Sequence, residues 1–208
     1  MKHPPAELRR YAQLVAGAQA SITSVRDPDE LWNVHIEDAL TAVPLIEPLG
    51  ATELVDVGSG GGSPAIPLGI VLGIPVTMVE SVGRKAAFLR ATCDALGLSA
   101  EVVAERAEEF GRGPGRDRYP LATARALAPP VVAAELTLPL VRPGGHLVLW
   151  AGLVDRSALD VAVAELASEV VDARPTGERR RLLVVRKLGP TPDRFPRRTG
   201  VAARRPLA

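Results

Sequence analysis

The chain has 208 residues, of which 47% are hydrophobic and 24% charged, and its formal net charge is +1. These values predict a folded globular protein, and the single cysteine, Cys93, excludes a disulfide framework and a thiolate metal cluster. No apolar run approaches the roughly 18 residues of a membrane span, and no signal-peptide core opens the chain, so we expect a cytoplasmic protein.

Two helices are predicted within residues 1–50, a segment that we expect to be helical. Apolar residues at helical spacing mark the first helix, before residue 20: Leu8, Tyr11, Ala12 and Val15. The second begins at Asp27, which can cap it. Pro28 suits the first helical turn, and Glu30 follows three residues after the cap.

From residue 53 onward, short apolar runs alternate with amphipathic stretches. The strand candidates are residues 53–57, 75–80, 100–105, 121–124, 145–150 and 181–187. The helix candidates are residues 64–72, 83–97, 129–140 and 155–168. Near-continuous Val and Leu runs indicate strands that are buried on both faces, as in a parallel sheet. The alternation therefore predicts a doubly wound α/β fold.

Charge is distributed unevenly along the chain. From Arg174 to the end, 11 basic residues stand against two acidic ones, a balance of +9, whereas the remainder carries 14 basic and 22 acidic residues, a balance of −8. Residues 189–208 are rich in Pro, Gly and Arg and are expected to form a loop or flexible tail after a domain of residues 1–188. A basic end fits a polyanionic partner, and a GC-rich genome that favours arginine is the alternative explanation.

The stretch LVDVGSGGGSPAIPLGI contains a glycine-rich loop between a predicted strand and a predicted helix. Gly58, Gly60 and Gly62 allow a ligand to approach the backbone N–H groups closely. Ser63 stands where a dinucleotide fingerprint would have glycine, which disfavours a nicotinamide cofactor. Glu80 closes the next strand, where an acid can accept hydrogen bonds from both hydroxyls of a ribose. A tight turn and a solvated acid could account for each feature alone, but together they favour an adenosine-containing ligand.

The pattern D-x-G-x-G-x-G, followed by an acid that closes the second strand, resembles the S-adenosylmethionine site of class I methyltransferases. The segments VESVGRKAAFLR, ERAEEF, ATARALAPP and PLVRPGGHLVLWAG follow in the order and spacing of the RsmG family, also called glucose-inhibited division protein B. SITSVRDPDELWNVHIEDAL and PRRTGVAARRPL are similar to further segments of that family. The resemblance implies a Rossmann-like, mostly parallel seven-stranded sheet. It also implies methyl transfer from S-adenosyl-L-methionine to N7 of a guanine in 16S ribosomal RNA.

The resemblance also implies which residues contact the donor: Gly58, Ser63, Glu80, Ala107, Glu108 and Arg125. Three positions depart from the family pattern. Ala151 stands where the family usually has Lys, Ala39 where it has Ser, and Ser21 where it has Asn. These departures concern the substrate side more than the donor side.

Guanine N7 carries a lone pair and no proton, so its methylation needs positioning rather than a general base. No catalytic residue is assigned; His35 and Asp38, which match the family, are the candidates, and no metal is expected. The candidates for contacts with RNA phosphates are Arg84, Lys85, Arg180, Arg197 and Arg198, joined in the basic C-terminal part by Arg179, Arg181, Arg204 and Arg205. Two alternatives stay open for a chain expected to be a monomer: a small-molecule methyltransferase, or an rRNA-binding assembly factor without catalysis.

Overall fold

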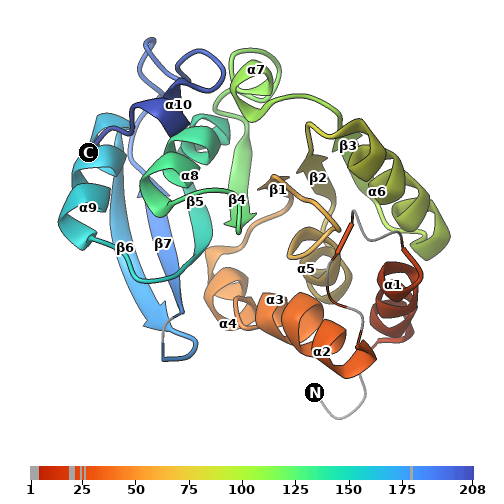
Figure 1. The fold of residues 1–208 in the computed structure, drawn as a ribbon. Helices are drawn as coiled ribbons and strands as arrows, with labels where there is room; N and C mark the ends of the chain where they lie inside the picture. Colours follow the sequence, from red (N-terminus) through yellow and green to blue (C-terminus); the bar gives the residue numbers. More distant parts are fainter. Residues whose placement is uncertain (1–4, 19–21, 24, 26, 179) are drawn as a thin grey trace. The chain divides into compact units, whose positions relative to one another are not determined.

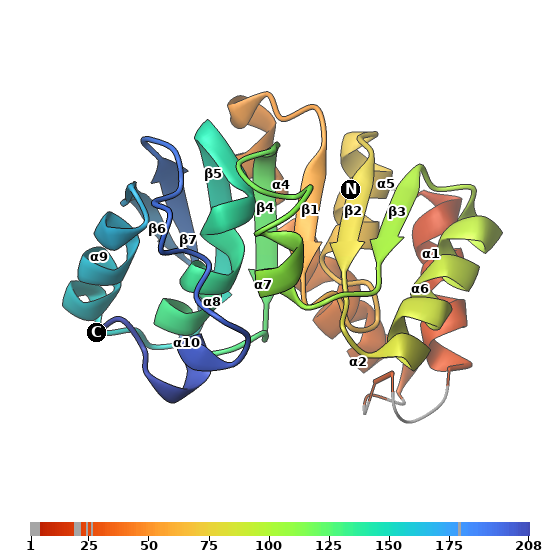
Figure 2. The same cartoon turned by 90° about the horizontal axis from the view of Figure 1, so that it is seen from above.

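A computed structural model describes residues 5–18, 22–23, 25, 27–178 and 180–208. Ser21 and Arg179, which were singled out in the sequence, lie outside these residues. The chain divides into two compact units, Met1–Ala104 and Glu105–Ala208 (Figures 1 and 2). Residues 189–208, expected to be a loop or flexible tail, belong to the second unit.

The first unit contains three parallel strands in the order β3-β2-β1. Their bounds are β1 Leu54–Val57, β2 Val76–Val79 and β3 Ala100–Val103. β1 and β2 are wholly buried, whereas β3 is half exposed. The helical elements are α1 Ala6–Ala16, α2 Pro28–Trp32, the π-helix η1 Asn33–Glu37, α3 Asp38–Leu40, α4 Val43–Ile46, the 3-10 helix η2 Glu47–Leu49, α5 Ala65–Leu72 and α6 Gly83–Leu96.

The predicted N-terminal helices are confirmed. Leu8, Tyr11 and Val15 form the buried stripe of α1. The helix α1 packs against α5 and α6 (Figure 1). The Asp27 carboxylate caps α2, because its Oδ1 accepts the backbone N–H groups of Asp29 and Glu30 at 3.0 and 2.9 Å.

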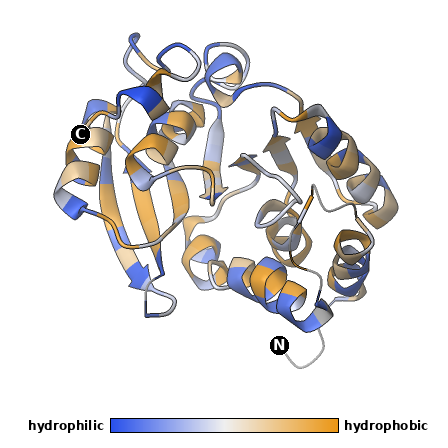
Figure 3. Ribbon diagram, viewed as in Figure 1, coloured by the Kyte–Doolittle hydropathy of each residue, from blue (hydrophilic) through white to orange (hydrophobic). Residues whose placement is uncertain are grey.

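The second unit contains four strands in the order β4-β5-β7-β6. Their bounds are β4 Tyr119–Arg125, β5 Val141–Ala151, β6 Ser168–Pro175 and β7 Arg181–Lys187. β4 and β5 are parallel, and β7 runs antiparallel to both of its neighbours. The helices are α7 Ala107–Phe110, α8 Pro130–Thr137, the 3-10 helix η3 Leu138–Leu140, α9 Arg156–Glu165 and α10 Val201–Arg204. Figure 3 shows β5 and β7 mostly in hydrophobic colours, as expected for strands in the core.

The described residues form seven strands, of which β1, β2 and β3 in the first unit and β4 and β5 in the second pair in parallel and alternate with helices along the chain; this confirms the predicted doubly wound α/β class. All six strands proposed from the sequence are present, and β6 is an addition to them. Among the described residues, no helix combines the length and the apolar composition needed to cross a membrane.

Lys187, at the end of β7, is a fully buried cation. Its Nζ donates to the Thr191 hydroxyl at 2.7 Å and to the Leu138 carbonyl at 3.2 Å, and it lies 3.8 Å from the Asp117 carboxylate. Burial lowers the pKa of Lys187 from its ordinary value to about 8; Asp117 acts in the opposite direction, and Arg116 adds to the lowering.

This depressed pKa predicts a stability that rises with pH. Between about pH 8 and about pH 10.5 the unfolded chain binds a proton that the folded chain has released, so the free energy of unfolding increases across this window by up to about 3 kcal/mol. Below about pH 8 the full cost of burying the charge is present. Urea unfolding of the wild type and Lys187→Met at several pH values measures this contribution. A stability difference between the two proteins that stays constant from pH 8 to 10 would contradict it.

Candidate functional site

The glycine-rich loop connects β1 to α5 and leans on the end of β2. The Gly58 N–H donates to the Val79 carbonyl at 2.8 Å, which continues the pairing of β1 with β2 past the last strand residue. Gly58, Gly60 and Gly62 have φ values of 72°, 55° and 100°. These left-handed conformations explain why glycine, which lacks Cβ, recurs at every second position.

The glycines of this loop serve two different purposes. A Cβ on Gly62 would lie 2.5 Å from Ile66 Cδ1 and 3.2 Å from Leu89 Cδ2, and both of these side chains are fully buried. Gly62 is therefore required by packing. A Cβ on Gly60 would meet one atom within 4 Å, the Gly58 carbonyl oxygen at 3.8 Å. The bare backbone at Gly60 thus leaves space that a side chain would fill, as a ligand-binding loop requires.

Replacing Gly62 by alanine is expected to destabilise the first unit. The new methyl group has no free space beside Ile66, and alanine is strained at a φ of 100°. Overpacking of this kind costs about 1–3 kcal/mol. Urea denaturation measures the loss, with Gly60→Ala as the matched control because its Cβ meets no side chain. Equal unfolding free energies for the two variants would show that packing does not set the requirement at Gly62.

Glu80 follows β2 and is 5% exposed. Its Oε2 accepts the Gly60 N–H at 2.9 Å, and its Oε1 accepts the Val82 N–H at 2.8 Å. The carboxylate is thereby fixed beside the open part of the glycine loop. A carboxylate can accept about four hydrogen bonds, so acceptor capacity is left for two hydroxyl donors. The geometry is therefore compatible with the ribose contact that the sequence predicts for Glu80.

Two N-terminal helices, α1 and η1, form hydrogen bonds with the glycine-rich loop. The Ser63 hydroxyl donates to the His35 carbonyl at 2.6 Å, and the Tyr11 hydroxyl donates to the Gly61 carbonyl at 3.0 Å. The His35 ring, carried by the π-helix η1, lies with Nε2 3.0 Å from the Thr23 hydroxyl. Asp38 is half-buried at the start of α3. His35 and Ser63, predicted for different roles, are thus joined directly.

Three predicted donor contacts lie in the second unit. Ala107 and Glu108 begin α7, and Glu108 is 7% exposed, with its Oε1 accepting the Gly200 N–H at 2.9 Å. Arg125 ends β4 and is half-buried; the residue after it, Ala126, has a positive φ of 52°. The contact between Glu108 and Gly200 was not predicted, because a backbone N–H belongs to almost every residue type and therefore leaves no signal in a sequence.

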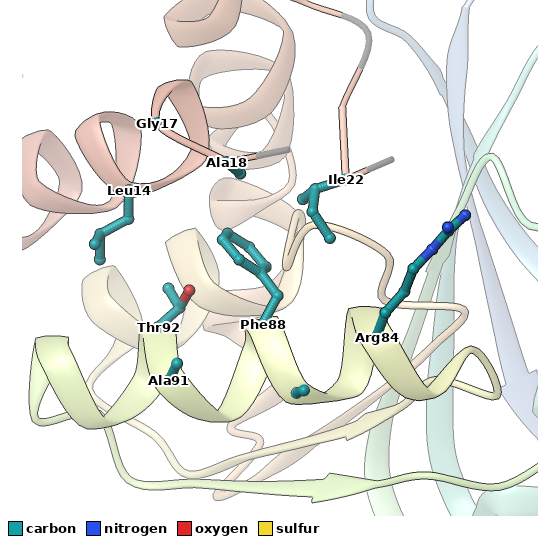
Figure 4. A pocket seen from close by; sticks show the side chains of 9 residues that line it. Leu14, Gly17, Ala18, Ile22, Arg84, Phe88, Ala91 and Thr92 are labelled. Carbon is teal, nitrogen blue, oxygen red and sulfur yellow. The ribbon is translucent and has the colours of Figure 1, made fainter. Parts of the chain in front are cut away.

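The predicted RNA contacts differ in their surroundings. Arg84 is exposed in the first turn of α6, where it borders an apolar pocket of about 550 Å³. Figure 4 shows Arg84, Phe88 and Thr92 along α6: Thr92 lies nearest to Leu14 of α1, and Arg84 extends away at the opposite end of the pocket. The neighbouring Lys85 is half-buried.

In the second unit Arg180 and Arg198 are exposed. Arg197 is not a free cation: its Nε donates to Glu135 Oε1 at 2.6 Å, and its second nitrogen, Nη2, contacts Glu135 Oε2. Hydrogen bonding to Glu135 raises the pKa of Arg197. The Arg197 charge is therefore neutralised by an ion pair with Glu135.

The single cysteine, Cys93, is buried and has a packing role. Burial and the nearby Asp94 raise the pKa of the Cys93 thiol to about 11, which keeps it protonated and unreactive near neutral pH. Within the described ranges, no group of three or more His, Cys, Asp or Glu side chains could hold a metal ion.

The chain is similar to proteins of one family. A family model described as "GidB: rRNA small subunit methyltransferase G" matches residues 5–180. Curated relatives carry the name "Ribosomal RNA small subunit methyltransferase G". One from Rubrobacter xylanophilus is 41% identical over 96% of this chain and 82% of its own length. One from Chloroflexus aggregans is 37% identical over 99% of this chain and 91% of its own length.

Solved structures with the same fold are more distant in sequence. A mutant of MtNAS in complex with S-adenosylmethionine has a TM-score of 0.60 and 18% identity, and the match covers 88% of this chain and 72% of that one. TrmN from Thermus thermophilus has a TM-score of 0.54 and 21% identity, with 72% of this chain and 49% of that one covered. These matches establish the fold class.

Proposed function

The chain belongs to the rRNA small subunit methyltransferase G family, and from this membership we propose that it transfers a methyl group from S-adenosyl-L-methionine to N7 of a guanine in 16S ribosomal RNA. The observation that carries the proposal is the buried Glu80 carboxylate, held by the N–H of Gly60 beside an open glycine backbone. A ribosomal substrate supports a cytoplasmic location, and we propose that the protein acts there as a monomer.

The donor is proposed to bind through its ribose and its methionine part. Glu80 would accept hydrogen bonds from the ribose hydroxyls, and the Gly58–Ser63 backbone would lie against the remainder of the donor. Ala107, Glu108 and Arg125 are the further contacts that family resemblance supports. When bound, S-adenosylmethionine supplies an electrophilic methyl group; the residues of this chain bind and orient.

Catalysis is proposed to rest on positioning. Because N7 has a lone pair and no proton, no side chain has to remove one. His35 is proposed as a positioning residue: its backbone carbonyl accepts the hydroxyl of Ser63 in the glycine loop, and its ring Nε2 lies 3.0 Å from the Thr23 hydroxyl. Asp38, in the next helix, is the second candidate on the substrate side.

RNA binding is proposed to use the exposed basic side chains. Arg84, Arg180 and Arg198 can each neutralise a phosphate, with Lys85 beside Arg84. Arg197 is a weaker candidate than the sequence indicates, since Glu135 already neutralises it. Such contacts would supply affinity, and the choice of base would come from the donor pocket.

The test is a methylation assay with three substrates: deproteinised 16S rRNA, small ribosomal subunits lacking the modification, and a metabolite extract. We expect 7-methylguanosine at one position, located by mass spectrometry of nuclease fragments, in one or both RNA substrates. Transfer to metabolites alone would favour a small-molecule methyltransferase. Donor binding without any transfer would favour an assembly factor, and either outcome overturns the proposal.

A further inference from the structure

α7 is too short to be stable by itself. It spans four residues, Ala107–Phe110, and one helical turn does not repay the entropy of its own nucleation. Its position must therefore be set by contacts with other parts of the second unit. Since α7 begins with two of the proposed donor contacts, Ala107 and Glu108, the elements that hold it can influence the donor site.

The C-terminal segment, residues 189–208, supplies such contacts along α7 and the turns that follow it (Figure 1). Glu108 accepts the Gly200 N–H at 2.9 Å. One turn further on, Arg112 donates from Nε to the Pro196 carbonyl at 3.2 Å and from Nη2 to the Arg197 carbonyl at 2.7 Å. The segment is thus hydrogen-bonded both to the first turn of α7 and to the turn that follows this helix.

Further contacts fix the segment before it reaches α7. Arg116 donates to the carbonyls of Phe195 and Thr191, both at 2.6 Å. The Asp117 carboxylate accepts the Thr191 hydroxyl at 2.5 Å. Phe195 is 2% exposed and anchors the segment in the core. The segment, which the sequence predicts to be a loop or flexible tail, is therefore packed and hydrogen-bonded within the second unit.

The role of Glu108 follows from these contacts. It is an acidic side chain, 7% exposed, and its Oε1 is taken by a backbone N–H of the C-terminal segment. A carboxylate engaged in this way ties the first turn of α7 to residue 200. If the proposed donor contact at this position is correct, it would come from the backbone of Ala107 and Glu108, and the Glu108 side chain would hold that backbone in position.

We propose that the C-terminal segment is a positioning element of the methyl-donor site, acting through Arg112 and the pair formed by Gly200 and Glu108 to hold α7 in its donor-binding place. This inference rests on the proposed function, because it takes the donor contacts at α7 from it. It assigns Arg112, which no sequence motif indicates, as a positioning residue. It also predicts that loss of these contacts weakens donor binding without weakening RNA binding in proportion.

Arg112→Ala in the full-length protein tests the proposal. Loss of two hydrogen bonds from a charged donor is expected to raise the Kd for S-adenosylhomocysteine, measured by calorimetry, about tenfold. The donor KM should rise by a similar factor, while kcat at saturating donor stays within about twofold of the wild-type value. Amide hydrogen exchange at residues 107–110 should become faster. Arg142→Ala, which removes an exposed arginine from β5 of the same unit, is the matched control.

A second pair of variants separates position from charge. Glu108→Gln keeps an oxygen that can accept the Gly200 N–H and is expected to bind the donor within about threefold of the wild type, whereas Glu108→Ala should resemble Arg112→Ala. Faster exchange in α7 with an unchanged donor Kd in Arg112→Ala would overturn the proposal, as would equal losses in both Glu108 variants. A wild type that binds the donor but methylates no RNA would instead refute the proposed function, and the donor Kd values would still decide this inference.

Discussion

Glu80→Ala is expected to abolish donor binding at working concentrations. The wild-type carboxylate is proposed to accept two ribose hydroxyls, and a hydrogen bond to a charged group is worth about 1.5–3 kcal/mol, so the donor Kd should rise by about 100-fold or more. The loss has a second source: the Gly60 and Val82 N–H groups lose their acceptor, and the glycine loop loses its attachment to the end of β2. Calorimetry with S-adenosylhomocysteine measures the effect.

Two further variants show how much of the lost donor affinity comes from the contact between Glu80 and the ligand. Glu80→Gln keeps one oxygen acceptor and should bind about tenfold more weakly than the wild type. Glu101→Ala, which removes an exposed carboxylate from the neighbouring strand β3, should leave the donor Kd unchanged. The affinity for 16S rRNA should be the same in all three variants. A wild-type donor Kd in a folded Glu80→Ala protein would remove the basis of the proposed function.

The first part of the site could be predicted because its chemistry is local. Gly60 and Glu80 each follow a parallel strand, and the carboxyl ends of neighbouring parallel strands meet at one edge of a sheet. Their positions directly after two strands therefore predicted that they lie together, and the Gly60 N–H does donate to Glu80 Oε2. The roles of the individual glycines could not be separated in the same way, because the requirement at Gly62 comes from Ile66 and Leu89.

Strand β6 shows where a periodic pattern fails. A register shift lies between Val170 and Asp172 in its pairing with β7, so the alternation of inward and outward residues is broken. Val171 is left 47% exposed, while polar residues share the strand. A half-exposed strand at the end of the sheet order gives neither the continuous apolar run of a buried strand nor a clean period of two.

The C-terminal segment could not be placed from its composition. Its Pro, Gly and Arg content is typical of a loop. The side chains of Arg112 and Arg116, 75 to 85 residues earlier in the sequence, bind backbone carbonyls of this segment. Every residue has such a carbonyl, so no residue type signals the contact. Arg197 shows the consequence: counted from the sequence it is one more cation for RNA, yet in the structure it is the partner of Glu135.

Arg197→Ala is therefore expected to lower stability more than it lowers RNA binding. The Glu135 side chain is 2% exposed and the Arg197 side chain 24%, so removing the guanidinium leaves a buried carboxylate without its counter-charge. Breaking a buried pair from one side costs about 3–5 kcal/mol. Urea denaturation should show this loss, whereas Arg198→Ala, at the exposed neighbouring position, should change the unfolding free energy by no more than about 0.5 kcal/mol.

Replacing both partners tests the physical reason for that loss. In the double variant Arg197→Met with Glu135→Met no charge is left uncompensated, and apolar side chains of similar length fill the space, so most of the stability should return. The salt dependence of RNA binding gives an independent readout. Loss of a phosphate contact lowers the slope of log K against log salt by roughly 0.7–0.9, which we expect for Arg198→Ala and not for Arg197→Ala. The prediction would be contradicted if Arg197→Ala had wild-type stability and a reduced salt-dependence slope. Arg197 would then contact RNA, and the buried Glu135 carboxylate would not need it as a partner.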